Sequence, residues 1–162
     1  MFSNQEDKVD FIIKTLENLY PKPEIPLDHK NTFTFLVAVM LSAQSTDKKV
    51  NEITPNLFAK ADSAKKMSML KVEQIKNLIR QIGLAPTKSK NIKKMSQILV
   101  EKYKGKVPNS LEKLKELPGV GQKTASVIVS QIFNEPAFPV DTHIHRLAYR
   151  WKLSSGKNVV QT

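Results

Sequence analysis

In Leu117-Pro118-Gly119-Val120-Gly121-Gln122-Lys123-Thr124-Ala125, a proline and two glycines enforce a tight turn between two segments with helical spacing. Before the turn, Ser110 can cap a short helix, and after it the helical spacing runs to Phe133. The two glycines allow backbone conformations closed to other residues, so Val120 can be buried while the amides of the turn point outward. The stretch predicts a helix, a hairpin turn and a second helix over residues 110–133.

The rest of the chain is helical by the same criterion. Apolar residues recur at helical spacing in Val9–Tyr20, Val72–Ile82 and Ile92–Leu99. Nearly every position from Phe33 to Leu41 is apolar, which predicts a helix enclosed on all sides. Another helix is expected to begin near Thr46 and to end near Pro55 or Phe58. Because we find no alternating strand pattern, linker or repeat, we expect an all-α protein.

The charge balance favours a polyanionic partner. Lys and Arg number 26 against 15 Asp and Glu, which gives a net charge of +11. Nucleic acid and an acidic membrane surface both fit this balance, and a basic but inert surface is the alternative. The longest apolar run is well short of the roughly 18 to 20 residues of a membrane span, so we expect no membrane partner.

The N-terminal sequence and the cysteine count constrain location and cofactors. Residues 1–10 carry three acidic side chains and no apolar core of a signal peptide, so we expect an intracellular protein, in the cytoplasm or nucleoid of a bacterium or otherwise in the nucleus or an organelle. The absence of cysteine excludes disulfides, thiolate metal sites and cysteine-ligated iron–sulfur clusters. His143 and His145 have no third ligand beside them, so we expect neither a metal nor another cofactor.

The glycine turn also has the features of an anion site. Free amides at the start of a helix, together with the positive end of the helix dipole, favour an anion, and the net charge makes nucleic-acid phosphate the expected one. A plain glycine-rich turn between two helices is the alternative. A nucleotide phosphate loop is disfavoured, because Lys123 does not directly follow a glycine.

Three motifs in this order resemble the endonuclease III branch of the helix-hairpin-helix DNA glycosylases. They are Leu41–Asp47, Leu117–Ala125, and Pro139–Ile144 followed by Arg146. The resemblance reaches from the first helix to about Val159. It implies a monomeric two-lobed helical bundle that binds double-stranded DNA carrying a damaged base or an abasic site. The implied lobes are a six-helix-type domain over residues 22–135, and a second lobe from residues 1–21 plus 136–162.

The resemblance assigns the chemistry to Lys123 and Asp141. An amine that attacks C1′ of a damaged deoxynucleotide displaces the base and leaves an imine, whose acidified C2′ proton permits elimination of the 3′ phosphate. Attack requires the neutral amine, which a helix N-terminus and partial burial of Lys123 are expected to favour. Asp141 is expected to stay ionised, to stabilise positive charge at the sugar and to help accept a proton. A solvated lysine and a helix-capping aspartate are the respective alternatives.

Further residues are expected to contact DNA. In the hairpin these are Gly119, Val120, Gly121, Gln122 and Thr124. By resemblance, Gln44 fills the gap left by the extruded nucleotide and Leu84 wedges into the base stack, whereas from the residues alone they are a helix-end glutamine and a core leucine. Lys88 and Lys90 belong to the probing loop. They open a run of lysines expected to attract phosphate, or to form a solvated helix face: Lys88, Lys90, Lys93, Lys94, Lys102, Lys104 and Lys106.

The sequence also departs from the family pattern. Most relatives continue past the equivalent of Gly156 with another helix and a four-cysteine loop that holds an iron–sulfur cluster, whereas this sequence ends at Thr162. We therefore expect an incomplete second lobe with uncovered apolar surface on the first helix and at Ile144, Leu147 and Trp151.

Two functions remain open at this point. The first is a bifunctional DNA glycosylase and abasic-site lyase that acts on oxidised pyrimidines through a lysine Schiff base. The second is a non-catalytic or inactive truncated helix-hairpin-helix module that binds DNA. A monofunctional mismatch glycosylase is a third option, which the amine at Lys123 disfavours. The preferred lesion and an alkali ion at the hairpin stay undetermined.

Overall fold

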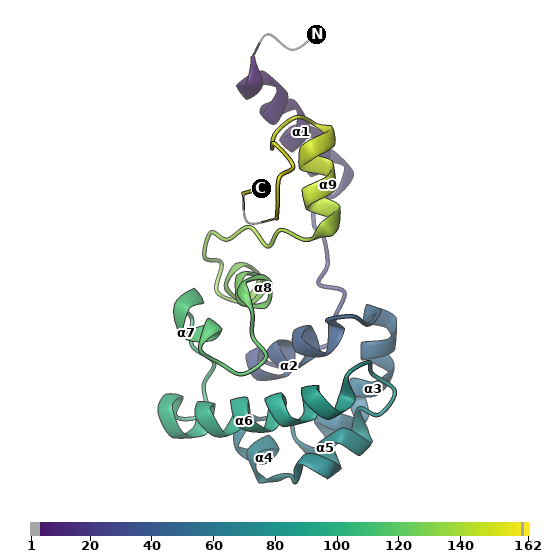
Figure 1. Ribbon diagram of the computed structural model, residues 1–162, viewed down its shortest axis with the longest axis vertical. Coiled ribbons are helices and arrows are strands. Elements are labelled where there is room, and N and C mark those ends of the chain that lie inside the picture. The colour runs from purple at the N-terminus through teal and green to yellow at the C-terminus, as the bar shows by residue number, and fades with distance from the viewer. Residues whose placement is uncertain (1–3, 160) are drawn as a thin grey trace. The chain divides into compact units, whose positions relative to one another are not determined.

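A computed structural model describes residues 4–159, 161 and 162, and over that part of the chain it contains helices and no strands, which confirms the all-α prediction (Figure 1). Residues 1–3, which belong to the N-terminal segment considered above, and residue 160 lie outside the described residues. No described helix combines the length and apolar character needed to cross a membrane. The helices are α1 (Gln5–Leu19), α2 (Thr32–Ser42), α3 (Asp47–Lys60), α4 (Ala64–Met69), α5 (Val72–Leu78), α6 (Ala85–Tyr103), α7 (Leu111–Lys115), α8 (Gln122–Ile132) and α9 (Thr142–Arg150).

The contacts between residues divide the chain into two units. The central unit is Pro26–Pro139 and contains α2 to α8. The terminal unit is Met1–Ile25 with Val140–Thr162 and contains α1 and α9. Each unit therefore carries part of the predicted chemistry, because Lys123 belongs to the central unit and Asp141 to the terminal unit.

Helix α2 forms the core of the central unit, as its sequence predicts. Every residue from Phe33 to Leu41 is buried, and α2 contacts α3, α6 and α8. A reciprocal cap fixes its start: the Asn31 side chain accepts from the Thr34 amide at 2.9 Å, and the Thr34 hydroxyl accepts from the Asn31 amide at 2.9 Å. On the other side of α6 lie α4 and α5, both of which contact it (Figure 1).

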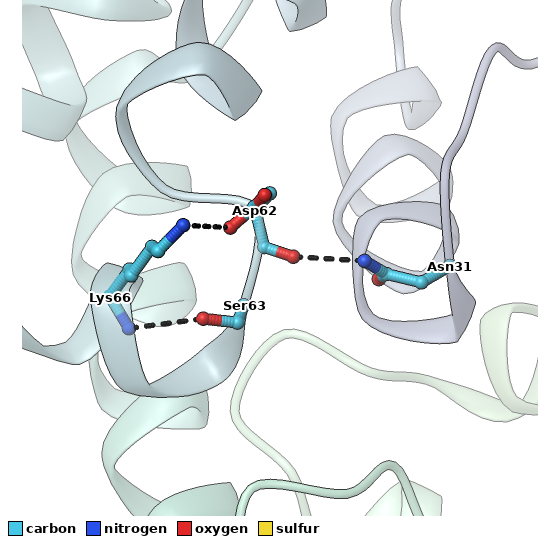
Figure 2. Close-up of polar contacts among 4 residues, drawn as sticks. All are labelled: Asn31, Asp62, Ser63 and Lys66. Atoms are coloured by element: carbon cyan, nitrogen blue, oxygen red, sulfur yellow. Dashed lines mark hydrogen bonds and ion pairs between the residues drawn. The ribbon is translucent and has the colours of Figure 1, made fainter.

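The start of α2 is also bonded to the start of α4 (Figure 2). The Asn31 amide group donates to the backbone oxygen of Asp62 at 3.0 Å, and the Asp62 carboxylate pairs with the Lys66 amine at 2.8 Å. Ser63 caps α4 by accepting from the Lys66 amide at 3.3 Å. Helix α4 was not predicted from the sequence, because a helix of 6 residues is too short for a periodic pattern to recur.

Helix α3 is longer than its sequence predicts. It begins as expected, with the Thr46 hydroxyl accepting from the Lys49 amide at 3.2 Å, but it passes through Pro55 and ends at Lys60. The expected end at Pro55 is therefore wrong, whereas the alternative near Phe58 lies within two residues of the observed end. A proline inside a helix costs about 3 kcal/mol, and apolar side chains buried on both sides of it, each contributing about 1.5–3 kcal/mol, offset that cost.

The terminal unit has no comparable core. None of its described residues is buried, and the first helix exposes large apolar side chains, with Phe11 56% and Leu19 64% exposed. The uncovered surface expected on this helix is therefore present, while Ile144, Leu147 and Trp151 are half-buried. The Lys8 amine donates to the backbone oxygen of Trp151 and so joins α1 to the end of α9.

Candidate functional site

The predicted helix, hairpin and helix unit is present in the central unit. Ser110 caps α7 through the Lys113 amide at 3.5 Å, and α7 contacts α8. Between the two helices, the Val120 amide donates to the Leu117 oxygen at 3.0 Å. Both of these side chains are buried, Leu117 at 2% and Val120 at 5% exposed, so the predicted burial of Val120 is confirmed.

The two glycines of the hairpin have different roles. Gly119 has φ +81°, and a Cβ there would lie 2.8 Å from Met40 Cε and 2.9 Å from Asn91 Nδ2, so both the conformation and the packing require glycine. Gly121 has φ −89° and ψ 179°, which any residue adopts, and an added Cβ would meet no atom within 4 Å. The expectation of a glycine-only conformation is therefore wrong for Gly121.

Gly121 instead serves as the N-cap of α8, and without a side chain it leaves the first turn of that helix accessible. Gln122 and Lys123 are exposed there and Thr124 is half-buried. Anions are favoured at such a helix start by its amides and its dipole. The exposure of Lys123 corrects one expectation, because the partial burial that was to favour its neutral amine is not found.

Asp141 is the N-cap of α9. Its Oδ1 accepts from the amides of His143 and Ile144, both at 2.9 Å. The predicted capping role is therefore confirmed, and it fixes the direction of the carboxylate at the start of the helix. Thr142, the first residue of α9, is exposed.

Gln44 and Leu84 share an unusual backbone conformation. Gln44 lies just beyond α2 with φ +59°, and Leu84 lies immediately before α6 with φ +61°. Both side chains are exposed, Leu84 at 55%, so the alternative of a core leucine is wrong. Left-handed backbone at residues other than glycine costs about 1–3 kcal/mol and concentrates at functional sites.

Lys88 and Lys90 lie in different surroundings, although both belong to α6. Lys90 is exposed, whereas Lys88 is 7% exposed and its amine donates to the backbone oxygens of Leu41 at 2.8 Å and Ala43 at 2.5 Å. Burial lowers the pKa of the Lys88 amine below its ordinary value. Sequence reasoning missed this contact, because nothing in a lysine-rich helix indicates which amine turns inward.

A second lysine of the same helix is bonded in a similar way. The Lys93 amine donates to the backbone oxygen of Ser68, at the end of α4. The other five lysines of the run are exposed and can contact phosphate: Lys90, Lys94, Lys102, Lys104 and Lys106.

This sequence contains no cysteine, so none of its residues can supply a thiolate ligand to the four-cysteine cluster that the resemblance implies. Among the described residues, no three side chains of His, Cys, Asp or Glu are grouped so that they could hold a metal ion. The two histidines of α9 have other partners: His143 Nδ1 lies 3.3 Å from Arg146 Nη2, and His145 Nδ1 lies 2.7 Å from the Thr162 hydroxyl.

Comparison with known sequences gives a consistent family. A family profile described as HhH-GPD superfamily base excision DNA repair protein matches residues 37–162. Endonuclease III of Bacillus subtilis (strain 168) is 40% identical over 153 residues, which cover 94% of this chain and 70% of that protein. Endonuclease III of Treponema pallidum (strain Nichols) is 45% identical over 149 residues, which cover 92% of this chain and 71% of that protein.

Solved structures agree with these sequence matches. A non-covalent endonuclease III–DNA complex has a TM-score of 0.90 at 37% identity and covers 97% of this chain and 73% of that one. A trapped endonuclease III–DNA covalent intermediate has a TM-score of 0.91 at 36% identity and covers 98% of this chain and 75% of that one. A thermostable thymine-DNA glycosylase, 22% identical with a TM-score of 0.86, shares the fold.

Proposed function

Because the chain belongs to the HhH-GPD superfamily of base excision DNA repair proteins, we propose that it is a DNA glycosylase that also cleaves abasic sites, acting on oxidised pyrimidines in duplex DNA. The observation that carries the proposal is the position of Lys123, an exposed amine in the first turn of α8 directly after the Gly119 turn. A covalent enzyme–DNA intermediate, as trapped in the endonuclease III relative, requires such a nucleophile.

The hairpin is proposed to hold the DNA backbone. The amides at the start of α8 and the side chains of Gln122 and Thr124 would bind phosphate, while Gly119 and Gly121 let the backbone approach closely and buried Val120 supports the turn. The exposed lysines of α6, Lys90 among them, would add phosphate contacts that carry no sequence preference.

Extrusion of the damaged nucleotide is assigned to Gln44 and Leu84. Extrusion costs a few kcal/mol, which side chains that occupy the vacated space reduce. The amide of Gln44 can hydrogen-bond to the base left without a partner, and the apolar side chain of Leu84 can enter a kinked base step. Their exposure and left-handed backbone support this assignment.

In the proposed reaction, the Lys123 nitrogen bonds to C1′ as the bond from C1′ to the base breaks, and the base leaves with that electron pair and takes up a proton. The sugar ring then opens as the C1′–O4′ bond breaks, O4′ takes up a proton, and loss of the second amine proton gives an imine. Removal of a C2′ proton then expels the 3′ phosphate as its C3′–O bond breaks. The carboxylate of Asp141 stabilises the positive charge at the sugar and accepts a proton from the amine.

Borohydride trapping on an abasic duplex tests the proposal. The wild-type protein is expected to form a covalent adduct with the DNA, because borohydride reduces the imine. Lys123→Ala should lose the adduct and strand cleavage, while Lys113→Ala, which removes an exposed amine from α7 of the same hairpin, should keep both. An adduct of full yield in Lys123→Ala would refute Lys123 as the nucleophile.

A second candidate is a DNA-binding module without catalysis. It is favoured by the lack of buried residues among those that the structure describes in the terminal unit, the unit that carries Asp141. Duplex binding without strand cleavage would support this module, and base release without cleavage would support a monofunctional glycosylase. Each function requires the protein to work where cellular DNA lies, in the nucleoid or in the nucleus or an organelle.

A further inference from the structure

The two residues assigned to the base stack lie on neighbouring segments of the central unit. Gln44 follows α2, Leu84 precedes α6, and both have left-handed backbone. A Cβ built on Gly83 would lie 3.5 Å from the backbone oxygen of Gln44, which is ordinary van der Waals contact. The turn after α2 and the loop before α6 therefore pack against each other.

Lys88 bonds to both of these segments. Its amide donates to the Leu84 oxygen at 2.9 Å, which places it one helical turn beyond that residue. Its side chain reaches the end of α2, where the amine donates to the oxygens of Leu41 and Ala43, and Ala43 directly precedes Gln44. One residue thus connects the backbone before Gln44 to the backbone of Leu84.

This contact opposes two energetic costs. The last carbonyls of a helix have no partner within the helix, and a cation that donates hydrogen bonds to them is favourable there. The left-handed backbone of Gln44 and Leu84 persists only where surrounding contacts hold it. Since Lys88 is almost fully buried, its bonds lie in a medium of low dielectric, where they are stronger than on the surface.

We propose that Lys88 is a positioning residue for nucleotide extrusion: its amine fixes the Leu41–Gln44 turn relative to Leu84, so that Gln44 and Leu84 enter the duplex as one unit. The inference rests on the proposed function, because it assigns Lys88 a task within base extrusion. It replaces the phosphate contact expected from the sequence, since the amine bonds to protein carbonyls.

The first experiment needs no DNA. Hydrogen exchange of the full chain is compared for wild type, Lys88→Met, and the control Lys93→Met, which also removes a carbonyl-bound amine of α6. In Lys88→Met the Ser45 amide, bonded to the Ser42 oxygen at 3.0 Å, should exchange faster. In Lys93→Met that amide should keep its protection. Unchanged protection of Ser45 in Lys88→Met would overturn the proposal.

The second experiment separates extrusion from chemistry. Lys88→Met should lose on the order of 100-fold in base release from lesion duplexes, because small displacements of positioning groups have effects of this size. Its borohydride adduct with a single-stranded abasic oligonucleotide, which needs no extrusion, should match that of wild type. Equal losses on duplex and single strand, or duplex activity equal to that of Lys93→Met, would overturn the proposal.

A double-mutant cycle identifies the residue through which Lys88 acts. If Lys88 positions Gln44, the effect of Lys88→Met on base release should nearly vanish in a Gln44→Ala background, whereas additive effects would contradict the proposal. A wild-type protein that forms no adduct would instead refute the proposed function. The exchange experiment would then still decide whether Lys88 holds the turn.

Discussion

The central and terminal units differ in what holds them together. The central unit encloses α2 completely and fixes its helices with side-chain caps at Asn31, Thr46, Ser63 and Ser110. The terminal unit has no buried residue in its described part, and its polar contacts include its helix caps and the Lys8–Trp151 bond. Lys123, the proposed nucleophile, thus belongs to a well-packed unit, whereas Asp141, its proposed acidic partner, is the N-cap of a helix in the other unit.

The two units hold Lys123 and Asp141, the two proposed catalytic residues, in place in different ways. Lys123 follows a turn in which Leu117 and Val120 are buried and Gly119 has no room for a Cβ, so packing sets its backbone. The Asp141 carboxylate is oriented by two hydrogen bonds from amides of its own helix. The unit that contains it is similar to the corresponding part of relatives that are longer than this chain. Local hydrogen bonds can therefore orient a functional carboxylate where little packing is available.

The largest effect is expected at Asp141, where charge and cap can be separated. Asp141→Asn keeps a good cap but loses the carboxylate, so strand cleavage should fall about 10²- to 10⁴-fold with little loss of stability. Asp141→Ala should lose as much cleavage and in addition about 1 kcal/mol of stability. Single-turnover kinetics measure the rate of strand cleavage, and urea unfolding measures the stability. If Asp141→Asn cleaved DNA at nearly the wild-type rate, Asp141 would act only as a helix cap.

Truncation of one leucine to alanine in each unit compares how tightly the two units are packed. Leu36→Ala, at a side chain that is 0% exposed in α2, should cost about 2–5 kcal/mol of unfolding free energy. Leu16→Ala, at a side chain that is 42% exposed in α1, should cost less than about 1 kcal/mol. Urea unfolding of both variants provides the comparison. Similar costs would mean that the terminal unit buries α1 as firmly as the central unit buries α2.

A smaller contrast is expected between two glycines with left-handed backbone. In Gly119→Ala the new methyl group meets buried Met40 and half-buried Asn91, whereas in Gly156→Ala it meets Tyr149, which is 60% exposed and can turn away. Gly119→Ala should therefore cost about 1–3 kcal/mol more than Gly156→Ala and should weaken duplex binding as well. Thermal unfolding and a DNA-binding titration test this, and equal costs would contradict it.

The smallest effect is expected at Asp62. Its hydrogen bond with Lys66 lowers the pKa of the carboxyl below its ordinary value, so the stability that it adds is present above the unfolded pKa of about 3.9 and is lost as the pH falls through the lower folded value. Asp62→Asn should melt slightly below wild type at neutral pH and together with it in acid. A difference in melting temperature that grows as the pH falls would contradict this prediction.

Local features of the fold could be predicted from the sequence, and contacts between distant segments could not. The apolar run of α2, the caps at Thr46 and Ser110 and the buried Val120 follow from patterns within a few residues. The passage of α3 through Pro55 depends on burial by other helices, which overrides a local signal. The exposure of Lys123 likewise depends on the folded surroundings of the turn.

In the candidate site, the hydrogen bonds of Lys88 likewise could not be predicted from the sequence. The amine and the Leu41 oxygen lie 47 residues apart in sequence, and seven similar lysines follow one another along that stretch. Side-chain type therefore indicated a role in DNA binding, while only the packing of α6 against α2 identifies which amine is turned inward.

Because the amines of Lys88 and Lys93 are bonded to backbone oxygens, the formal charge of this run overstates the number of ions that DNA can release on binding. Seven phosphate contacts would displace enough counterions to give a logarithmic salt slope of about −6.3, whereas the five exposed amines limit their share to about −4.5. Two hydrogen-bonded lysines, one buried and one half-buried, thus make the protein less sensitive to ionic strength than its sequence suggests.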